Sequence, residues 1–185
     1  MVGTKNNRRT KYTIQLLKNA LLTILTREPL AKVTITEICR EANVNRGTFY
    51  LHFESPGDLF EAIEKDISNQ VIPLLKVRPR DDLYEWGRRL VSVIEDNQIA
   101  MKIILDAKRE DRVIQQIFDE AHELFLKDFA EQFDVTNQTV QEYYFTYFVN
   151  GSIGILKKWL EGNDEITADE IARIIINPNL LQPKA

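Results

Sequence analysis

The sequence lacks most features that mark a secreted, metal-binding or catalytic protein. Its 185 residues include one cysteine, Cys39, and two histidines, His52 and His122. A single cysteine excludes an intramolecular disulfide framework and is typical of a reducing compartment. The sequence contains no Cys and His spacing of a metal site, no nucleophile elbow, no zinc-protease motif and no phosphate-binding glycine loop. We therefore predict that the protein is not an enzyme and uses no metal or cofactor.

Glycine, proline and long apolar runs are scarce as well. The chain has seven Gly and six Pro, too few for a disordered or linker-rich protein. No segment approaches the roughly 18 consecutive apolar residues of a membrane span. The basic N-terminus is followed by apolar residues that Gln15, Lys18 and Asn19 interrupt, so it has no signal-peptide core. We expect a cytoplasmic protein with no membrane partner.

Strand-like alternation is nearly absent, whereas apolar residues recur with helical spacing along the whole chain. We predict an all-α fold of about nine helices, with a three-helix head that contains a helix-turn-helix and a larger helical body. The head is placed in residues 1–54 and the body in residues 55–185. The expected helices span residues 11–26, 35–42, 46–53, 56–75, 82–96, 98–107, 111–133, 137–161 and 167–176.

Charge is distributed unevenly along the chain, although the net charge is only −4. Residues 1–53 contain nine Lys or Arg and three Asp or Glu, an excess of six positive charges. Residues 54–185 contain the other 15 bases and 25 acids, an excess of ten negative charges. A basic front and an acidic back favour contact of the front with a polyanion. Chance clustering of charge on solvated surfaces is the alternative.

Local signals fix the helix starts in the basic part. Thr34 and Glu37 have the spacing of a capping box, and Asn45 is a good N-cap for the next short helix. Ser55 caps a fourth helix with Pro56 at its first position, where the missing N–H costs nothing. Two short helices joined by a three-residue turn make a helix-turn-helix.

The second helix of such a unit enters the DNA major groove with its first residues against base edges. Arg46 suits a bidentate contact with guanine, Gly47 allows close approach, and Thr48 can touch a thymine methyl or a phosphate. Tyr50 and His52 are expected to contact phosphates, with packing inside the head as the alternative. The predicted DNA-contacting residues are Thr34, Thr36, Asn45, Arg46, Gly47, Thr48, Tyr50 and His52.

The segment TITEICREANVNRGTFYLHFESPGDLFEAI resembles the DNA-binding segment of the TetR/AcrR family of bacterial transcriptional regulators. The resemblance covers about residues 10–66. The positions that match the family pattern are Thr34, Ile38, Ala42, Val44, Gly47, Thr48, Phe49, Tyr50, His52, Phe53, Ser55 and Leu59.

The resemblance implies a homodimer that binds a roughly palindromic double-stranded operator. It also implies a repressor that a small molecule, bound in the body, releases from DNA. Residues 1–54 would then bind DNA, and residues 55–185 would bind the effector and form the dimer. The alternative is a family member without a small-molecule inducer, acting through a protein partner or as a DNA-organising factor.

Two departures from the family pattern affect the DNA-binding segment. Asn43 stands where the family turn has glycine, and Asn tolerates a left-handed backbone, so we expect the turn to form. Pro56 and Gly57 replace the Lys-Glu pair that opens the fourth helix in the family, which removes a lysine that often contacts phosphate.

The body carries large residues for two further roles. The last two predicted helices are apolar on most sides, which favours burial against a partner subunit, with a single covered core helix as the alternative. The predicted dimer interface comprises Phe148, Ile155, Trp159, Ile171, Ile174 and Ile175. The predicted ligand pocket comprises Trp86, Met101, Phe118, His122, Phe125, Tyr144 and Tyr147, for which plain core packing is the alternative.

Overall fold

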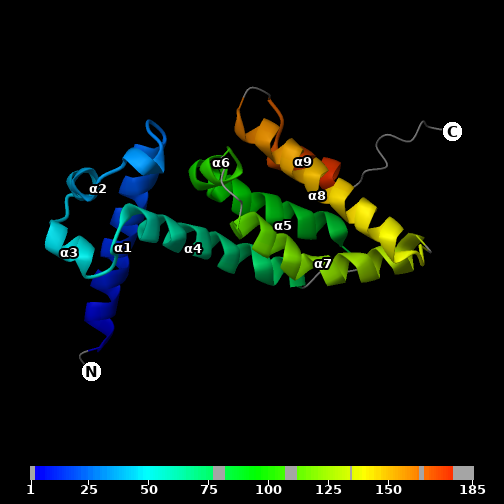
Figure 1. Ribbon diagram of the computed structural model, residues 1–185, viewed down its shortest axis with the longest axis horizontal. Helices are drawn as coiled ribbons and strands as arrows, with labels where there is room; N and C mark the ends of the chain where they lie inside the picture. The colour runs from blue at the N-terminus through cyan, green and yellow to red at the C-terminus, as the bar shows by residue number, and fades with distance from the viewer. Residues whose placement is uncertain (1–2, 77–81, 107–111, 134, 163–164, 177–185) are drawn as a thin grey trace. The chain divides into compact units, whose positions relative to one another are not determined.

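The computed structural model describes residues 3–76, 82–106, 112–133, 135–162 and 165–176. Within these residues the chain forms nine α-helices and one 3-10 helix, and no strand (Figure 1). The prediction of an all-α fold is confirmed. The predicted helix ends at Ala107 and Asp111 lie outside the described residues.

The chain divides by packing into two compact units, a head of residues Met1–Asp66 and a body of residues Ile67–Ala185. The division falls inside α4, the helix that the two units share. Our boundary after residue 54 marks instead the point where the helix-turn-helix ends. It stays a prediction about which residues bind DNA.

The head is built from α1, the 3-10 helix η1, α2, α3 and the first part of α4. Their largest fully buried side chains include Leu17 and Leu21 of α1, Ile38 of α2 and Phe49 of α3. These side chains join the short helices to α1, because two turns of helix cannot bury enough apolar surface alone. The helices span Gly3–Leu25, Leu30–Lys32, Ile35–Glu41, Arg46–Tyr50 and Pro56–Lys76.

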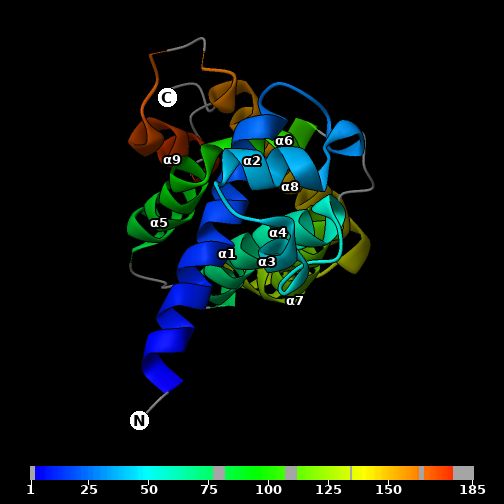
Figure 2. The same cartoon turned by 90° about the vertical axis from the view of Figure 1, so that its left-hand side faces the viewer.

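Two helix ends in the head differ from the sequence prediction. Helix α1 begins at Gly3 rather than after Thr10, because residues 3–10 contain no proline and include Lys and Arg, which are good helix formers. Its first turns project beyond α2 and α3 (Figures 1 and 2). Helix α3 ends at Tyr50 rather than Phe53, and the amides of His52 and Phe53 both donate to the Phe49 carbonyl in the turn that follows.

The start of α4 follows the prediction. The helix begins at Pro56, and the Ser55 hydroxyl accepts from the Asp58 amide at 3.1 Å. Asp58 in turn accepts from the Glu54 amide at 2.9 Å. Pro73 lies inside the last turn of α4, and the helix ends at Lys76. Proline therefore starts this helix at one end and precedes its termination at the other.

In the body, α5 packs mainly against α9, and α8 packs against α6, α7 and α9. Val91, Ile171 and Ala172 form a buried cluster between α5 and α9. Gly87 lets the two helices approach closely, since a Cβ there would lie 1.8 Å from the Ile176 side chain. The helices α5 to α9 span Leu83–Asp96, Gln98–Asp106, Arg112–Phe133, Gln138–Leu160 and Ala168–Ile176.

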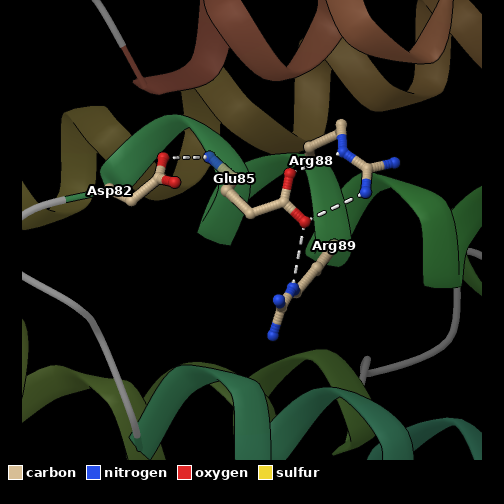
Figure 3. Close-up of polar contacts among 4 residues, drawn as sticks. All are labelled: Asp82, Glu85, Arg88 and Arg89. Atoms are coloured by element: carbon tan, nitrogen blue, oxygen red, sulfur yellow. Dashed lines mark hydrogen bonds and ion pairs between the residues drawn. The ribbon is translucent and has the colours of Figure 1, made fainter.

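The first two turns of α5 carry a cluster of charged side chains (Figure 3). Asp82 caps the helix by accepting from the Glu85 amide at 2.9 Å. The Glu85 carboxylate accepts from Arg88 at 2.9 and 3.0 Å and from Arg89 at 3.2 Å. The Arg88 and Arg89 guanidinium groups lower the pKa of Glu85 from its ordinary 4.5 to about 2.

Candidate nucleic-acid interface

The capping box predicted at the start of α2 is present. The Thr34 hydroxyl oxygen accepts from the Glu37 amide at 3.3 Å, and the Thr34 amide donates to the Glu37 carboxylate at 2.9 Å. The Thr34 hydroxyl also donates to the same carboxylate at 2.6 Å. These hydrogen bonds, together with the nearby Arg40, lower the pKa of Glu37. The hydroxyl proton of Thr34, a residue predicted to contact DNA, is therefore given to Glu37 in this structure.

The turn between α2 and α3 forms as expected around Asn43. Asn43 has φ of 52°, in the left-handed region that asparagine tolerates better than most residues. The Val44 amide donates to the Cys39 carbonyl at 2.9 Å, which closes the end of α2. Cys39 is buried, and burial raises the pKa of its thiol. The turn is thus held without the glycine that the family pattern has there.

Helix α3 begins with a second side-chain cap. The Asn45 side-chain oxygen accepts from the Thr48 amide at 2.7 Å and from the Thr48 hydroxyl at 3.0 Å. Gly47 is exposed, and a Cβ there would lie 3.3 Å from the same Asn45 oxygen. The short helix therefore presents backbone rather than side chain at Gly47. The side-chain amide nitrogen of Asn45 is not used by the cap.

Arg46 and Tyr50 form a pair on the exposed surface of α3, one helical turn apart. An Arg46 Nη2 donates to the Tyr50 hydroxyl at 3.2 Å, and the guanidinium carbon lies 5.9 Å from the centre of the Tyr50 ring. The hydrogen bond to Tyr50 raises the pKa of Arg46. Tyr50 is 53% exposed, so its ring does not belong to the core of the head.

His52 lies in the turn after α3 and is half-buried. Its ring is edge-on to Phe53, with 6.4 Å between the ring centres. The position of His52 is therefore compatible both with packing in the head and with contact with a phosphate. The structure exposes Thr34, Thr36, Asn45, Arg46, Gly47 and Tyr50, and leaves Thr48 and His52 half-buried.

Exposed basic side chains are spread over the helices of the head. Six of the exposed ones, spread over α1, η1, α2 and α3, are Arg8, Arg9, Lys11, Lys32, Arg40 and Arg46. Lys18 of α1 differs from Arg8, Arg9 and Lys11, because it is buried and bonded to α4. The positive charge predicted from the sequence is thus largely exposed on the head, as contact with a phosphate backbone requires.

Comparisons with known proteins agree with this arrangement. Residues 19–63 match the family model described as bacterial regulatory proteins, tetR family. Residues 81–178, more than half of the chain, match a model described as transcriptional regulator C-terminal region, from the same set of regulators. The chain belongs to the TetR family of bacterial transcriptional regulators. No curated protein matches the sequence.

Solved structures of TetR-family regulators share the fold. A regulator from Streptococcus agalactiae is 21% identical, with a TM-score of 0.63 over 94% of this chain and 96% of that one. NalD of Pseudomonas aeruginosa, the secondary repressor of the MexAB-OprM multidrug efflux pump, is 18% identical, with a TM-score of 0.69 over 94% and 96%. The dihydroxyacetone kinase operon activator DhaS is 16% identical, with a TM-score of 0.61 over 92% and 95%.

The residues nominated for a ligand pocket fall into separate environments of this TetR-family chain. Phe118, His122 and Phe125 of α7 pack edge-on to Phe145 of α8, with ring centres 4.7 to 6.5 Å apart. His122 also contacts the Glu142 carboxylate at 2.8 Å.

Two other nominated residues are tied into the body, and two are exposed. Trp86 donates to the Leu74 carbonyl at 2.7 Å, which holds α5 to the end of α4, and Met101 is buried. Tyr144 and Tyr147 are 48% and 64% exposed on α8. Their exposure suits a protein contact better than an enclosed pocket.

The residues nominated for the dimer interface are largely engaged within the chain itself. Phe148 stacks on Phe125, with ring centres 5.1 Å apart. Trp159 packs on the cluster around Ile171 and donates to the Ile166 carbonyl at 3.1 Å. Ile171 belongs to that cluster, Ile155 and Ile175 pack against it, and Ile174 is half-buried outside it.

A second face of α8 carries residues that the sequence did not assign to an interface. Tyr143 is 75% exposed, and a Cβ added at Gly151 or Gly154 would meet no atom within 4 Å. The face is a stripe at steps of three and four residues, formed by Val140, Tyr143, Tyr144, Tyr147, Gly151 and Gly154. This spacing was available in the sequence, but apolar residues on all sides of the helix concealed it.

Among the described residues, no group of three His, Cys, Asp or Glu side chains is placed to hold a metal ion. Within the same part of the chain, no helix is both long and apolar enough to cross a membrane.

Proposed function

We propose that the chain is a homodimeric repressor that binds a roughly palindromic operator and is released by a small molecule bound in its body. The observation that carries the proposal is the capped, solvent-exposed N-terminal turn of α3, with Arg46 beside Gly47 on a basic head. Arginine is the residue most often used to read guanine in the major groove. Repression is the activity typical of the TetR family.

The proposed DNA contacts fall into two groups. Arg46 and Thr48 face base edges, together with the unused amide nitrogen of Asn45, and Gly47 allows the backbone to approach. Phosphate contacts come from Thr36, from His52 and from the basic side chains of the head. Thr34 contributes by capping α2 rather than by donating to a phosphate, because its hydroxyl already donates to Glu37.

The proposed dimer contact is the exposed stripe of α8. Tyrosines are enriched in protein interfaces because they combine an apolar ring with a hydrogen-bonding tip. Two glycines on the same face allow a partner helix to come close. We therefore move the centre of the interface from the residues predicted from the sequence to Tyr143, Tyr147, Gly151 and Gly154.

Two neighbours in structure suggest opposite signs of regulation: NalD is a repressor and DhaS an operon activator. A second function, regulation through a protein partner without a small molecule, is favoured by the ring packing between α7 and α8. Phe118 and Phe125 contact Phe145, and Phe125 stacks on Phe148, so aromatic side chains occupy this part of the packing between α7 and α8.

Selection of DNA tests the core of the proposal. The full-length chain is mixed with a pool of random duplexes, and the bound fraction is amplified and sequenced. An inverted repeat, with half-sites about 10 base pairs or a multiple apart, is expected. Absence of any enriched sequence would contradict sequence-specific DNA binding.

Release by a ligand is tested next, with the selected duplex and a library of small molecules. A true effector raises the melting temperature of the free protein and lowers its affinity for the duplex, because it binds the DNA-incompetent state better. If no compound does both, the protein-partner function is favoured instead.

A further inference from the structure

The contact between Arg46 and Tyr50 gives Tyr50 a role different from the phosphate contact expected from the sequence. Tyr50 lies one turn after Arg46 on α3, where residues four apart are neighbours on the helix surface. Its hydroxyl accepts from Arg46, and the guanidinium carbon of Arg46 lies over its ring, 5.9 Å from the ring centre. Among the described residues, none of the observed ion pairs involves Arg46. The contact with Tyr50 is therefore the interaction that restrains the Arg46 side chain.

The Tyr50 ring is itself held by packing against Phe49. It stands edge-on to Phe49, with ring centres 5.9 Å apart and an angle of 88° between the planes. Phe49 is fully buried in the head and also contacts Phe53. A continuous set of contacts therefore runs from the core of the head through Tyr50 to the end of Arg46.

Free arginine side chains have many rotamers, and holding one in place on binding costs conformational entropy. A guanidinium that is already positioned before DNA arrives loses less on binding, which raises affinity only where its geometry matches the base. On an α-helix as short as α3, few other side chains can supply such a restraint. Asn45 and Thr48 are bonded to each other instead.

We propose that Tyr50 is a positioning residue for Arg46 and thereby sets the base preference of α3 at the position that Arg46 reads. This inference rests on the proposed function, because it requires Arg46 to contact a base. It differs from the phosphate hypothesis in a measurable way. A phosphate contact would strengthen binding to every sequence, whereas a positioning residue strengthens binding only to the preferred one.

The test uses the full-length chain and three duplexes of equal length: the one selected from a random pool, its variant at the base pair most affected by Arg46→Ala, and a scrambled sequence. Binding of wild type, Tyr50→Phe, Arg46→Ala and the double variant is measured by fluorescence anisotropy at several salt concentrations. Tyr50→Phe removes the hydroxyl and keeps the ring. Tyr12→Phe, at an exposed tyrosine of α1, is the matched control.

We expect Tyr50→Phe to lower discrimination between the selected and variant duplexes by about two- to tenfold, the worth of one hydrogen bond. Affinity for the scrambled duplex and the salt dependence should not change. In the Arg46→Ala background, Tyr50→Phe should have no further effect on discrimination, because the residue it positions is gone. Tyr12→Phe should behave as wild type.

Three results would overturn the inference. An equal loss on all three duplexes, with a salt slope smaller by about one, would make Tyr50 a phosphate contact. Unchanged discrimination in Tyr50→Phe, with discrimination lost in Arg46→Ala, would show that Arg46 reads a base without help from Tyr50. If wild type selects no sequence, the proposed function fails, and the inference fails with it. Circular dichroism of each variant checks that the head remains folded.

Discussion

At the scale of single residues, the head uses polar side chains to start its helices before any of them meets DNA. Thr34, Asn45 and Ser55 each accept from a backbone amide three residues later. Such caps satisfy amides that a helix leaves without an internal partner. A residue used in this way has less freedom to bind a phosphate, as the hydroxyl of Thr34 illustrates.

Substitutions of Thr34 and Thr36 therefore distinguish an effect on stability from an effect on DNA binding. Thr34→Ala is expected to lower the free energy of unfolding by about 1 kcal/mol, because it removes the cap of α2. Thr36→Ala, at an exposed position of the same helix, should leave stability unchanged and weaken binding to all duplexes equally. Urea denaturation and anisotropy measure the two quantities. Equal stability of both variants would contradict the role of the Thr34 cap.

At the scale of helices, α1 and α4 are joined by a lysine that is buried in the head. The Lys18 Nζ donates to the Ala62 carbonyl at 3.0 Å and to the Asp66 carboxylate at 2.6 Å. The Lys18 side chain is 9% exposed, whereas that of Asp66 is 54% exposed. The lysine side chain is thus buried, and its ammonium group reaches the solvent-exposed carboxylate of Asp66, the last residue of the head.

Lys18→Ala should lower the stability of the head by roughly 1–3 kcal/mol, because it removes both hydrogen bonds and the packing of the stem. Far-UV circular dichroism during urea unfolding measures the loss over all helices. Fluorescence of Trp86 and Trp159 monitors the body alone. Lys11→Ala, at an exposed position of α1, is the control. If the urea midpoint measured by circular dichroism is unchanged in Lys18→Ala, Lys18 does not stabilise the packing of α1 on α4.

The charged cluster of α5 predicts a dependence of stability on pH. The pKa of Glu85 is about 2 in the folded chain and about 4.5 when its partners are absent, so folding favours its charged form. This stabilisation is complete above pH 4.5 and is lost as the pH falls towards 2. Glu85→Gln has no carboxylate to protonate, so it should lose less stability than wild type as the pH falls. Melting temperatures of both proteins at pH 5 and pH 3 test this prediction.

Glu95→Gln, at an exposed position of the same helix, is the control for this measurement. If wild type and Glu85→Gln lose the same stability between the two pH values, the cluster does not stabilise α5. Added salt should reduce the difference between them, because the side chains are partly exposed to solvent.

At the scale of the whole molecule, the proposed dimer depends on which face of α8 is free. In the single chain, Gly151 and Gly154 have open space where a side chain would be. Gly154→Leu should therefore not disturb the chain itself, and the loss of glycine should favour the helix. Against a closely packed partner helix, the same side chain should weaken dimerisation by about 1–3 kcal/mol per copy.

Sedimentation equilibrium measures the effect on the dimer, and thermal unfolding measures the effect on the chain. Gln138→Leu, at an exposed position near the start of α8 and outside the stripe, is the control. A more stable protein with an unchanged dimerisation constant would place the interface elsewhere.

The sequence by itself determined the all-α fold, most helix starts and the helix-turn-helix segment of this protein. Capping boxes, N-caps and a proline at a first helical position act over three or four residues, so their spacing in the chain is enough to predict them. The start of α4 at Pro56 was predicted for that reason, whereas the left-handed turn at Asn43 was expected from the glycine that the resembled family has there. The TetR family is identified from the same short segment.

Only the tertiary structure decided which of its possible contacts each side chain makes. The sequence did not reveal that Arg46 rests on Tyr50, since both residues are compatible with many side-chain conformations. Nor did it reveal which face of α8 is turned to the body, because Phe148 and Trp159 on one face and Tyr143 and Tyr147 on the other are all large and partly apolar. Packing against α6, α7 and α9 covers one set and leaves the other exposed, and that choice depends on neighbours distant in the chain.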